Sequence, residues 1–423
     1  MKFFRQLTHF WIPQLNPQVW ILAIGRFLSG IGTGFTLFYA PIFFVNQVGL
    51  SAIQVGFALG SGAISKALGH IVGGSFCDSQ FWGRRRTLLL SAAISAVASL
   101  VLAATSNFST LVVGNLLMGL GLGLYWPATE AVVADLTQGE QLKEAYAITR
   151  LADSLGLGLG IVFAGVLIGT TGAYRALFVI DAISFVVFFG VVYAAIAETY
   201  KPGKREQQAL TSWAIALRDR YLLIFCLVNI IFTTYISQTQ STMPLYFSNF
   251  IPVGESGKGF SPTTISALFT WHLVLAIVLQ LPVVRILKRF THPYALCISA
   301  LFWGLGFSLI WFTGVAESNQ LLWAILAMGV FAIATVSYMP SASSLITDLA
   351  PESQRGVYFS INSLCWAAGY FIGPPLGGWA LDQPPVVAHS FWLGLALSVA
   401  ITIAILQYLN RILNAKNAES NAK

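Results

Sequence analysis

Residues 52–76 read AIQVGFALGSGAISKALGHIVGGSF, and the chain continues through CDSQFWGRRR to residue 86. This apolar run has the length that a helix needs to cross a bilayer, about 20 residues, and Asp78 and three arginines follow it closely. Basic residues just after such a run are typical of the cytoplasmic end of a span. The stretch therefore predicts a membrane-spanning helix and the side on which it ends.

The whole chain shares the composition of this stretch. Of its 423 residues, 56% are apolar and 9% are charged, and the mean hydropathy is +0.74. Because a soluble domain carries roughly 25% charged residues, this composition excludes an ordinary soluble enzyme. The four cysteines lie far apart with no C-x-x-C pair, so we expect neither a disulfide framework nor a metal site.

Apolar runs of spanning length recur along the chain, and each is bounded by turn or charge signals. They predict an all-α membrane protein with twelve transmembrane helices. The expected spans are residues 19–45, 52–76, 87–105, 110–133, 147–170, 174–197, 220–248, 262–284, 293–314, 320–345, 357–380 and 389–411.

The basic residues test this count, because cytoplasmic loops carry an excess of lysine and arginine. With the N-terminus inside, 19 of the 23 basic residues fall in cytoplasmic segments, and only Arg175 and Lys258 fall outside. An error of one span would move every later loop to the other side. We therefore predict a multi-pass protein of the cell (inner) membrane with both termini cytoplasmic, and we read the net charge of +7 as topology, not as binding to nucleic acid.

The two halves of the chain repeat each other. A shift of 213 positions superimposes Tyr338 on Tyr125 and Gly369 on Gly156, and a constant offset through several helices indicates a duplication. We expect two six-helix bundles related by a pseudo-twofold axis. The expected organisation is a cytoplasmic tail at 1–18, a bundle at 19–197, a cytoplasmic linker at 198–219, a second bundle at 220–411 and a cytoplasmic tail at 412–423.

These features resemble the major facilitator superfamily over nearly the whole chain, and most of all its bacterial drug/proton antiporter-like branch. The family signature between helices two and three is G-x-x-x-D, two residues, then G-R-R/K. Here Gly74 and Asp78 precede Gly83-Arg84-Arg85-Arg86, with two extra residues in the loop. The resemblance implies a secondary transporter with the major facilitator fold.

The resemblance also implies a cytoplasmic gate. In the family the signature carboxylate lies against the start of helix eleven, so Asp78 would meet residues 356–360 and hold the cytoplasmic side shut. The alternative is that the arginines only anchor the loop inside the cell. The expected gate residues are Gly74, Asp78, Gly83, Arg84, Arg85, Arg86, Asp135 and Arg150.

Glycines recur along helix five, and their run resembles the family's antiporter signature. The usual glycine-proline pair is missing there, because Ile161 follows Gly160. Close helix packing explains the glycines at least as well as a role in coupling.

Several ionisable groups lie at membrane depth, where each needs a partner or a wet cavity. Relatives of the drug/proton branch usually carry an acid in helix one and an arginine in helix four, whereas here helix one has no acid and Asn115 occupies the arginine position. Lys66 either contacts an anionic substrate or pairs with an acid such as Asp153, and Arg26 either lines the cavity or snorkels to the surface. The candidates for coupling are Asp153, Asp181 and His272. Asp181 is better explained as a satisfied structural carboxylate of helix six, and His272 is explained equally well as a hydrogen-bonded packing residue.

By the same resemblance, helices one, four, seven and ten line the central path. Their residues there are aromatic or uncharged and polar, with few charges, which suits amphiphilic organic molecules better than highly charged metabolites. The expected cavity residues are Arg26, Phe35, Tyr39, Lys66, Asn115, Tyr125, Trp126, Asn229, Thr233, Gln240 and Tyr338.

We therefore predict export of hydrophobic or amphiphilic small molecules by alternating access, with protons as the coupling ion. A uniporter or symporter for a polar metabolite such as a sugar or organic acid is the alternative, and a receptor built on a transporter scaffold is a third class. An enzyme is disfavoured, because no nucleophile and base pattern is visible. The expected partners are a small-molecule substrate, the lipid bilayer and protons, with no cofactor and a monomeric functional unit.

Overall fold

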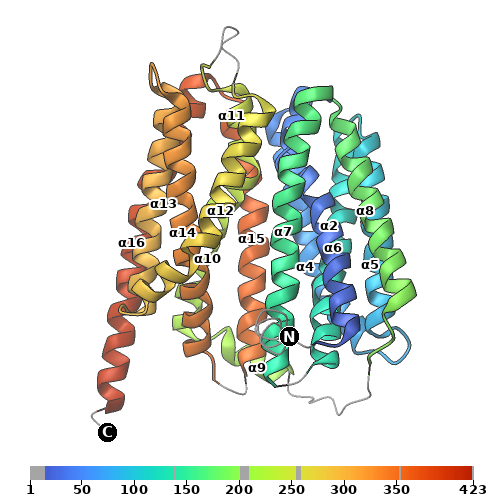
Figure 1. Ribbon diagram of the computed structural model, residues 1–423. Helices are drawn as coiled ribbons and strands as arrows, with labels where there is room; N and C mark the ends of the chain where they lie inside the picture. The colour runs from blue at the N-terminus through green and yellow to red at the C-terminus, as the bar shows by residue number, and fades with distance from the viewer. Residues whose placement is uncertain (1–14, 138, 201–208, 254–258, 352–353, 422–423) are drawn as a thin grey trace, which may run out of the picture. The chain divides into compact units, whose positions relative to one another are not determined.

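The computed structural model describes residues 15–137, 139–200, 209–253, 259–351 and 354–421. Every regular element within these residues is a helix (Figure 1), as the sequence predicted. The helices are α2 (Pro17–Leu37), α3 (Ala40–Asn46), α4 (Ala52–Cys77), α5 (Gly83–Ala104), α6 (Phe108–Leu136), α7 (Glu140–Thr171), α8 (Tyr174–Ala195), α9 (Ala209–Ala216), α10 (Arg220–Gln240), α11 (Thr242–Asn249), α12 (Pro262–Leu287), α13 (His292–Val315), α14 (Gln320–Leu349), α15 (Arg355–Leu381) and α16 (Pro385–Asn421).

In the described part of the chain, 11 helical segments are long and apolar enough to cross a membrane. The remaining predicted span, 357–380, corresponds to α15, which has 27 residues but is not among those segments. Glycine, proline, serine and an asparagine lower its hydropathy. The helix is long enough to span a bilayer, yet its composition is unlike that of a lipid-facing helix.

Four predicted spans differ from the observed helices, and one of them is the span predicted at 147–170, which corresponds to α7 and begins at Glu140. The span predicted at 19–45 is broken into α2 and α3, and the span at 220–248 is broken into α10 and α11. The last helix, α16, continues past residue 411 to Asn421, into the range expected for the C-terminal tail. Polar side chains that accept from free N–H groups fix several helix starts, as Asn16 does for α2 and Asp219 for α10.

The chain divides into two compact units. The first comprises Met1–Phe43 and Ser61–Lys204, and the second comprises Phe44–Gly60 and Arg205–Lys423. In the first unit α2 packs on α7 and α8, while α5 packs on α6 and α8. In the second unit α10 packs on α15 and α16, while α13 packs on α14 and α16. The two sets of pairings are equivalent, as a duplication requires.

The first turns of α4 belong to the second unit. The Asp382 carboxylate accepts hydrogen bonds from the backbone N–H groups of Ala52 at 2.8 Å and Ile53 at 2.9 Å. The amide groups of Asn46 and Asn249 also pair, at 2.8 Å in each direction. An anion at a helix N-terminus is favourable because the first N–H groups have no partner within the helix, so Asp382 fixes where α4 begins.

Glycines allow the closest helix contacts in both units. In the first unit a Cβ on Gly156 or Gly160 of α7 would collide with a backbone carbonyl of α2. In the second unit a Cβ on Gly369 or Gly373 of α15 would collide with a side chain of α10. Small residues let helices approach closely within a membrane. Here the glycines let α7 approach α2 and let α15 approach α10.

Candidate functional site

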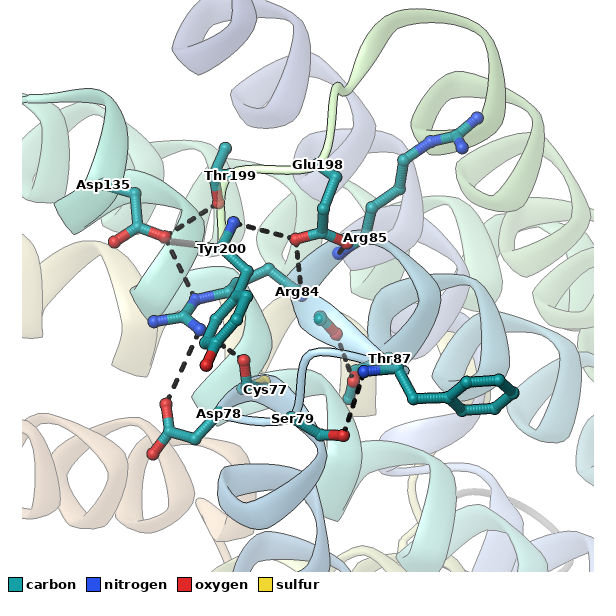
Figure 2. A network of polar contacts seen from close by, with 12 residues as sticks. Cys77, Asp78, Ser79, Arg84, Arg85, Thr87, Asp135, Glu198, Thr199 and Tyr200 are labelled. Carbon is teal, nitrogen blue, oxygen red and sulfur yellow. Dashed lines mark hydrogen bonds and ion pairs between the residues drawn. The ribbon is translucent and has the colours of Figure 1, made fainter. Parts of the chain in front are cut away.

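Arg84 is the centre of a charge network at the end of α4 (Figure 2). Its Nε lies 3.0 Å from Oδ2 of Asp135, and its Nη1 lies 3.6 Å from Oδ1 of Asp78. The guanidinium also donates to the Cys77 carbonyl and lies 4.9 Å from the centre of the Tyr200 ring. The family motif therefore joins the ends of α4, α5 and α6, and we call Asp78, Arg84 and Asp135 the Arg84 network.

Glu198 is part of the same arrangement, although the sequence analysis assigned it to a linker. Its carboxylate accepts from the backbone N–H groups of Arg84 at 2.9 Å and Arg85 at 3.1 Å, at the N-terminus of α5 (Figure 2). Gly83 has a φ of +68°, a left-handed conformation that favours glycine. Glu198 thus binds the backbone of two of the motif's arginines, although it lies more than 100 residues later in the chain. An acid directly after a predicted span was the signal for it.

The remaining predicted gate residues take different positions. Arg85 donates to the Tyr193 carbonyl at 2.7 Å, and the Arg86 guanidinium lies 5.6 Å from the centre of the Phe81 ring. A Cβ on Gly74 would meet nothing within 4 Å, so close packing does not require this glycine. Arg150 is exposed on α7 and joins no ion pair of the Arg84 network within the described residues. Asp78 keeps a side chain that is 58% exposed, and its latch to helix eleven stays a prediction.

A second charged group lies at mid-helix in the first unit. Arg26, the tenth of the 21 residues of α2, is 2% exposed. Its Nε donates to Oδ1 of Asp153 at 3.0 Å, and its Nη2 donates to Oδ2 of the same carboxylate. The guanidinium lies 5.8 Å from the centre of the Tyr125 ring and 5.6 Å from that of Trp126. We call these four residues the ionic cluster.

This geometry decides between the alternatives for Arg26 and Lys66. Arg26 does not snorkel, because it is buried and paired with Asp153 by two parallel hydrogen bonds, the strongest arrangement for these groups. Asp153 remains 28% exposed. Lys66 makes no ion pair within the described residues and is exposed on α4, as are His70 and, on α6, Glu130. Asp153 is therefore the partner of Arg26 and not of Lys66.

The other coupling candidates are held by single hydrogen bonds. Asp181 is 1% exposed and accepts from the Ser99 hydroxyl at 2.7 Å, while its Oδ1 is buried with no hydrogen-bond partner among the described residues. The Nδ1 of His272 lies 3.2 Å from the Met328 carbonyl. In the described part of the chain, no three His, Cys, Asp or Glu side chains form a group that could hold a metal ion.

Four predicted cavity residues are buried within their units. Phe35 and Tyr39 are 7% and 0% exposed. The Asn115 amide donates to a carbonyl of its own helix, that of Leu111, at 2.9 Å. Thr233 donates to the Asn229 carbonyl and to the Cys365 carbonyl of α15. These side chains contribute to packing within helix pairs in the structure.

The second unit carries an uncharged group near the position of the ionic cluster, although the offset of 213 places Trp366, and not Asn362, at the position of Asp153. Asn229 is the tenth of the 21 residues of α10, as Arg26 is of α2. Its Nδ2 donates to Oδ1 of Asn362 at 2.6 Å, and its Oδ1 accepts from the hydroxyl of Tyr338, the counterpart of Tyr125. We call Asn229, Tyr338 and Asn362 the amide cluster.

Three residues of α15 beside this cluster were missed from the sequence. Asn362, Trp366 and Tyr370 are each four residues apart and partly exposed. A spacing of four places side chains on one face of a helix, so the pattern was visible. It was passed over because helix eleven was not among the helices expected to line the central path.

Two repeated helical units with bilayer-length spans and polar clusters at mid-helix define a class, the multi-pass integral membrane transporters. The chain belongs to the Major Facilitator Superfamily, whose sequence pattern matches residues 22–254 and 247–422. This family consists of transporters, in agreement with the prediction of a transporter over an enzyme.

Individual relatives are distant but match along nearly their full length. The chain is 24% identical to a Na(+), Li(+), K(+)/H(+) antiporter of Planococcus maritimus, over 87% of this chain and 91% of that protein. It is also 24% identical to the multidrug resistance protein MdtH of Blochmanniella floridana, over 93% and 96%. A crystal structure of the nucleoside transporter NupG superimposes with a TM-score of 0.79 at 13% identity, over 93% of this chain and 99% of that one. This last likeness concerns the fold.

Proposed function

We propose that this protein exports hydrophobic or amphiphilic small molecules across a bacterial inner membrane by alternating access, with protons as the counter-ion. The relatives named above as a multidrug resistance protein and as a cation/proton antiporter support this class of transport. The predicted excess of basic residues in the cytoplasmic segments supports an orientation with both termini inside the cell.

The observation that carries the proposal is the Arg26–Asp153 pair. A charge at mid-membrane is expensive and marks a functional site by default, and this pair lies at the middle of α2 with Arg26 buried. Asp153 keeps partial exposure, so a proton can reach the carboxylate. Protonation would neutralise Asp153 and remove the charge-assisted hydrogen bonds that hold Arg26.

This gives the ionic cluster two distinct states. With Asp153 ionised, the pair is neutral as a whole and compact. With Asp153 protonated, the Arg26 charge retains the rings of Tyr125 and Trp126 and the field of the Glu130 carboxylate, and cation–π contacts are weaker than a bidentate ion pair. Protonation therefore shifts the balance between arrangements of α2 and α7, which is how a proton gradient would drive alternating access.

The Arg84 network supplies the second part of the proposal. Arg84 links the ends of three helices through Asp78 and Asp135, and Asp78 is largely exposed. We propose that this network fixes the cytoplasmic end of the first unit during the transport cycle, so that Asp78 is presented for a latch.

The test uses proteoliposomes with the full chain and an imposed pH gradient. Ethidium and tetraphenylphosphonium are offered as lipophilic cations, Na⁺, Li⁺ and K⁺ as metal ions, and a sugar and an organic acid as polar metabolites, while a trapped pH dye reports proton movement. Asp153→Asn removes the titrating group, and Glu317→Gln makes the same kind of change at an exposed acid far from the cluster in sequence.

The proposal predicts gradient-dependent movement of a lipophilic cation that Asp153→Asn abolishes and Glu317→Gln preserves. Movement of the alkali cations alone would favour the second candidate, cation/proton antiport, which the Planococcus maritimus relative supports. Movement of the sugar or acid without proton flux would replace the proposal with a uniporter for a polar metabolite.

A further inference from the structure

One face of α15 combines amide and aromatic side chains. Asn362, Trp366 and Tyr370 follow each other at intervals of four residues and are all partly exposed. The Trp366 and Tyr370 rings are stacked, with centroids 6.0 Å apart and an interplanar angle of 21°. Together with Gln240 of α10, these residues form what we call the α15 face, which lies entirely within the second unit.

The α15 face rests on a fixed polar base. Asn362 accepts from Asn229 at 2.6 Å, and Asn229 in turn accepts from the Tyr338 hydroxyl. The Tyr370 hydroxyl donates to Oε1 of Gln240 at 2.9 Å. The amides and rings are therefore held in place before any ligand arrives, and such preorganisation favours binding.

The composition of the α15 face does not suit contact with lipid. An amide in hydrocarbon lacks the partners that water provides, and Asn362 is partly exposed near the start of this helix. The opposite side of α15 carries the exposed apolar residues Leu364 and Phe371. The exposed hydroxyls of Ser360 and Ser363 bond to carbonyls of their own helix, whereas the Asn362 NH₂ group makes no such bond in the part of the chain that the structure describes. This difference indicates that the α15 face meets water or a polar ligand during transport.

The two amide side chains of the α15 face keep unused donors, beside the Tyr370 hydroxyl oxygen, which can still accept. Asn362 and Gln240 use their carbonyl oxygens as acceptors, and within the described residues neither side-chain NH₂ group donates a hydrogen bond. Both amides therefore offer N–H groups beside two stacked rings. A flat ring system can stack on Trp366, while an acceptor on its edge receives a hydrogen bond from an amide.

We propose that the α15 face is a recognition surface for planar aromatic compounds that carry a hydrogen-bond acceptor such as a ring carbonyl. The inference rests on the proposed function in one respect, namely that the ligand is cargo. It adds the chemical class of that cargo and assigns its recognition to residues of the second unit. Trp366 supplies the stacking surface, and Asn362 and Gln240 supply the donors.

The test measures binding of acridone, a flat, neutral, fluorescent compound with one ring carbonyl, to the detergent-purified full chain by fluorescence anisotropy. Trp366→Ala removes the stacking surface and should weaken binding about tenfold. Trp366→Phe keeps an aromatic ring and should stay within about threefold of the parent. Asn362→Ala removes a donor and should weaken binding about fivefold.

A matched control lies on the same helix. Trp379 is 48% exposed and belongs to another side of α15, so Trp379→Ala should leave acridone binding within about twofold of the parent, since its ring is outside the proposed surface. Thermal unfolding checks that each variant folds. If Trp366→Ala does not fold, the acridone affinities of Trp366→Phe and Asn362→Ala decide whether the α15 face binds the ligand.

The inference is overturned if the parent protein does not bind acridone, or if Trp366→Ala and Trp379→Ala lose the same affinity. It is also overturned if the two single variants Asn362→Ala and Trp366→Ala both bind as tightly as the parent. Binding needs no gradient, so its outcome is separate from that of the proposed function. Binding that depends on Trp366, without any proton-driven transport, would reject the proposed function and keep the recognition surface.

Discussion

Both units place paired polar side chains at mid-helix, where α2 meets α7 and where α10 meets α15, but the chemistry differs and Asp153 and Asn362 are not at equivalent positions of the repeat. In the first unit the middle of α2 carries Arg26, which is paired with Asp153 of α7 above the Tyr125 ring. In the second unit the middle of α10 carries Asn229, which is paired with Asn362 of α15 and bound by the Tyr338 hydroxyl. One copy of the repeat has kept or gained a buried ion pair, while the other is uncharged.

The difference separates two tasks that a coupled transporter has to perform. A carboxylate that pairs with an arginine changes its interactions when it binds a proton, whereas amides and tyrosines keep theirs across the working range of pH. Amides and rings instead offer hydrogen bonds and flat surfaces to a ligand. We therefore assign coupling to the ionic cluster and recognition to the amide cluster with the α15 face, and the following predictions test that division.

The largest effect is expected from removing one charge of the ionic cluster. Arg26→Gln leaves Asp153 without its partner. Breaking a fully buried pair costs about 3–5 kcal/mol, and because Asp153 is 28% exposed, we expect a loss at the lower end of that range. The double variant Arg26→Gln/Asp153→Asn places two amides there, as in the second unit, and should recover most of that loss. Denaturant titrations in mixed micelles measure the free energy of unfolding of the single and the double variant. A double variant that is no more stable than Arg26→Gln would contradict this expectation.

A smaller effect is expected from the glycines that bring each helix pair together. A Cβ on Gly156 meets the Phe27 backbone carbonyl, whereas one on Gly373 meets first the hydroxyl of Ser237, which can rotate away. Overpacking costs about 1–3 kcal/mol, so Gly156→Ala should be the more destabilising of the two. Thermal unfolding of the two variants side by side measures the difference, and the reverse order would show that α10 and α15 are the more tightly fixed pair.

The caps of α5 and α4 provide the next comparison. Glu198 receives two N–H groups of α5 in the first unit, and Asp382 receives two of α4 in the second. Replacing a cap by alanine costs about 0.5–2 kcal/mol, so Glu198→Ala and Asp382→Ala should each lose about 1 kcal/mol. Unfolding midpoints should fall by similar amounts. A silent Glu198→Ala would show that the Arg84 network holds the start of α5 without the cap.

The smallest effect is expected from the two equivalent tyrosines. The Tyr338 hydroxyl bonds to Asn229, so Tyr338→Phe removes that bond and should cost about 1 kcal/mol. Within the described residues the Tyr125 hydroxyl makes no hydrogen bond, and its ring faces Arg26. Tyr125→Phe should therefore be close to neutral. Equal losses of unfolding free energy in the two variants would contradict the expectation that only the Tyr338 hydroxyl makes a stabilising hydrogen bond.

Much of the fold was predictable from the sequence, because bilayer length and loop charge constrain an apolar chain strongly. The span predicted at 52–76 agrees with α4 to within one residue. The breaks after Leu37 and Gln240 were missed although Pro41 and Pro244 follow them closely, because the apolar runs resume beyond both prolines. The constant offset of 213 predicted the equivalence of α7 and α15, whereas the equivalence of α2 and α10 rests on their matching helix contacts.

The sequence predicted which residues form the ionic cluster, but it did not predict which of them pair with each other. Arg26 and Asp153 were both singled out at membrane depth, yet Lys66 was considered as the partner of Asp153, because sequence distance does not report which helices touch. The glycines of α7 decide the matter, since they let α7 approach α2 and bring Asp153 against Arg26. Glu198 and the α15 face were missed because their partners come from distant parts of the chain.

The most direct test of the division compares two kinds of ethidium transport by Asp153→Asn in the same proteoliposomes. Accumulation driven by a pH gradient requires coupling, whereas exchange of internal for external ethidium without a gradient requires only recognition and alternating access. The account predicts that Asp153→Asn loses gradient-driven accumulation and keeps exchange. Accumulation at the parent rate, or loss of exchange together with accumulation in a folded variant, would contradict it.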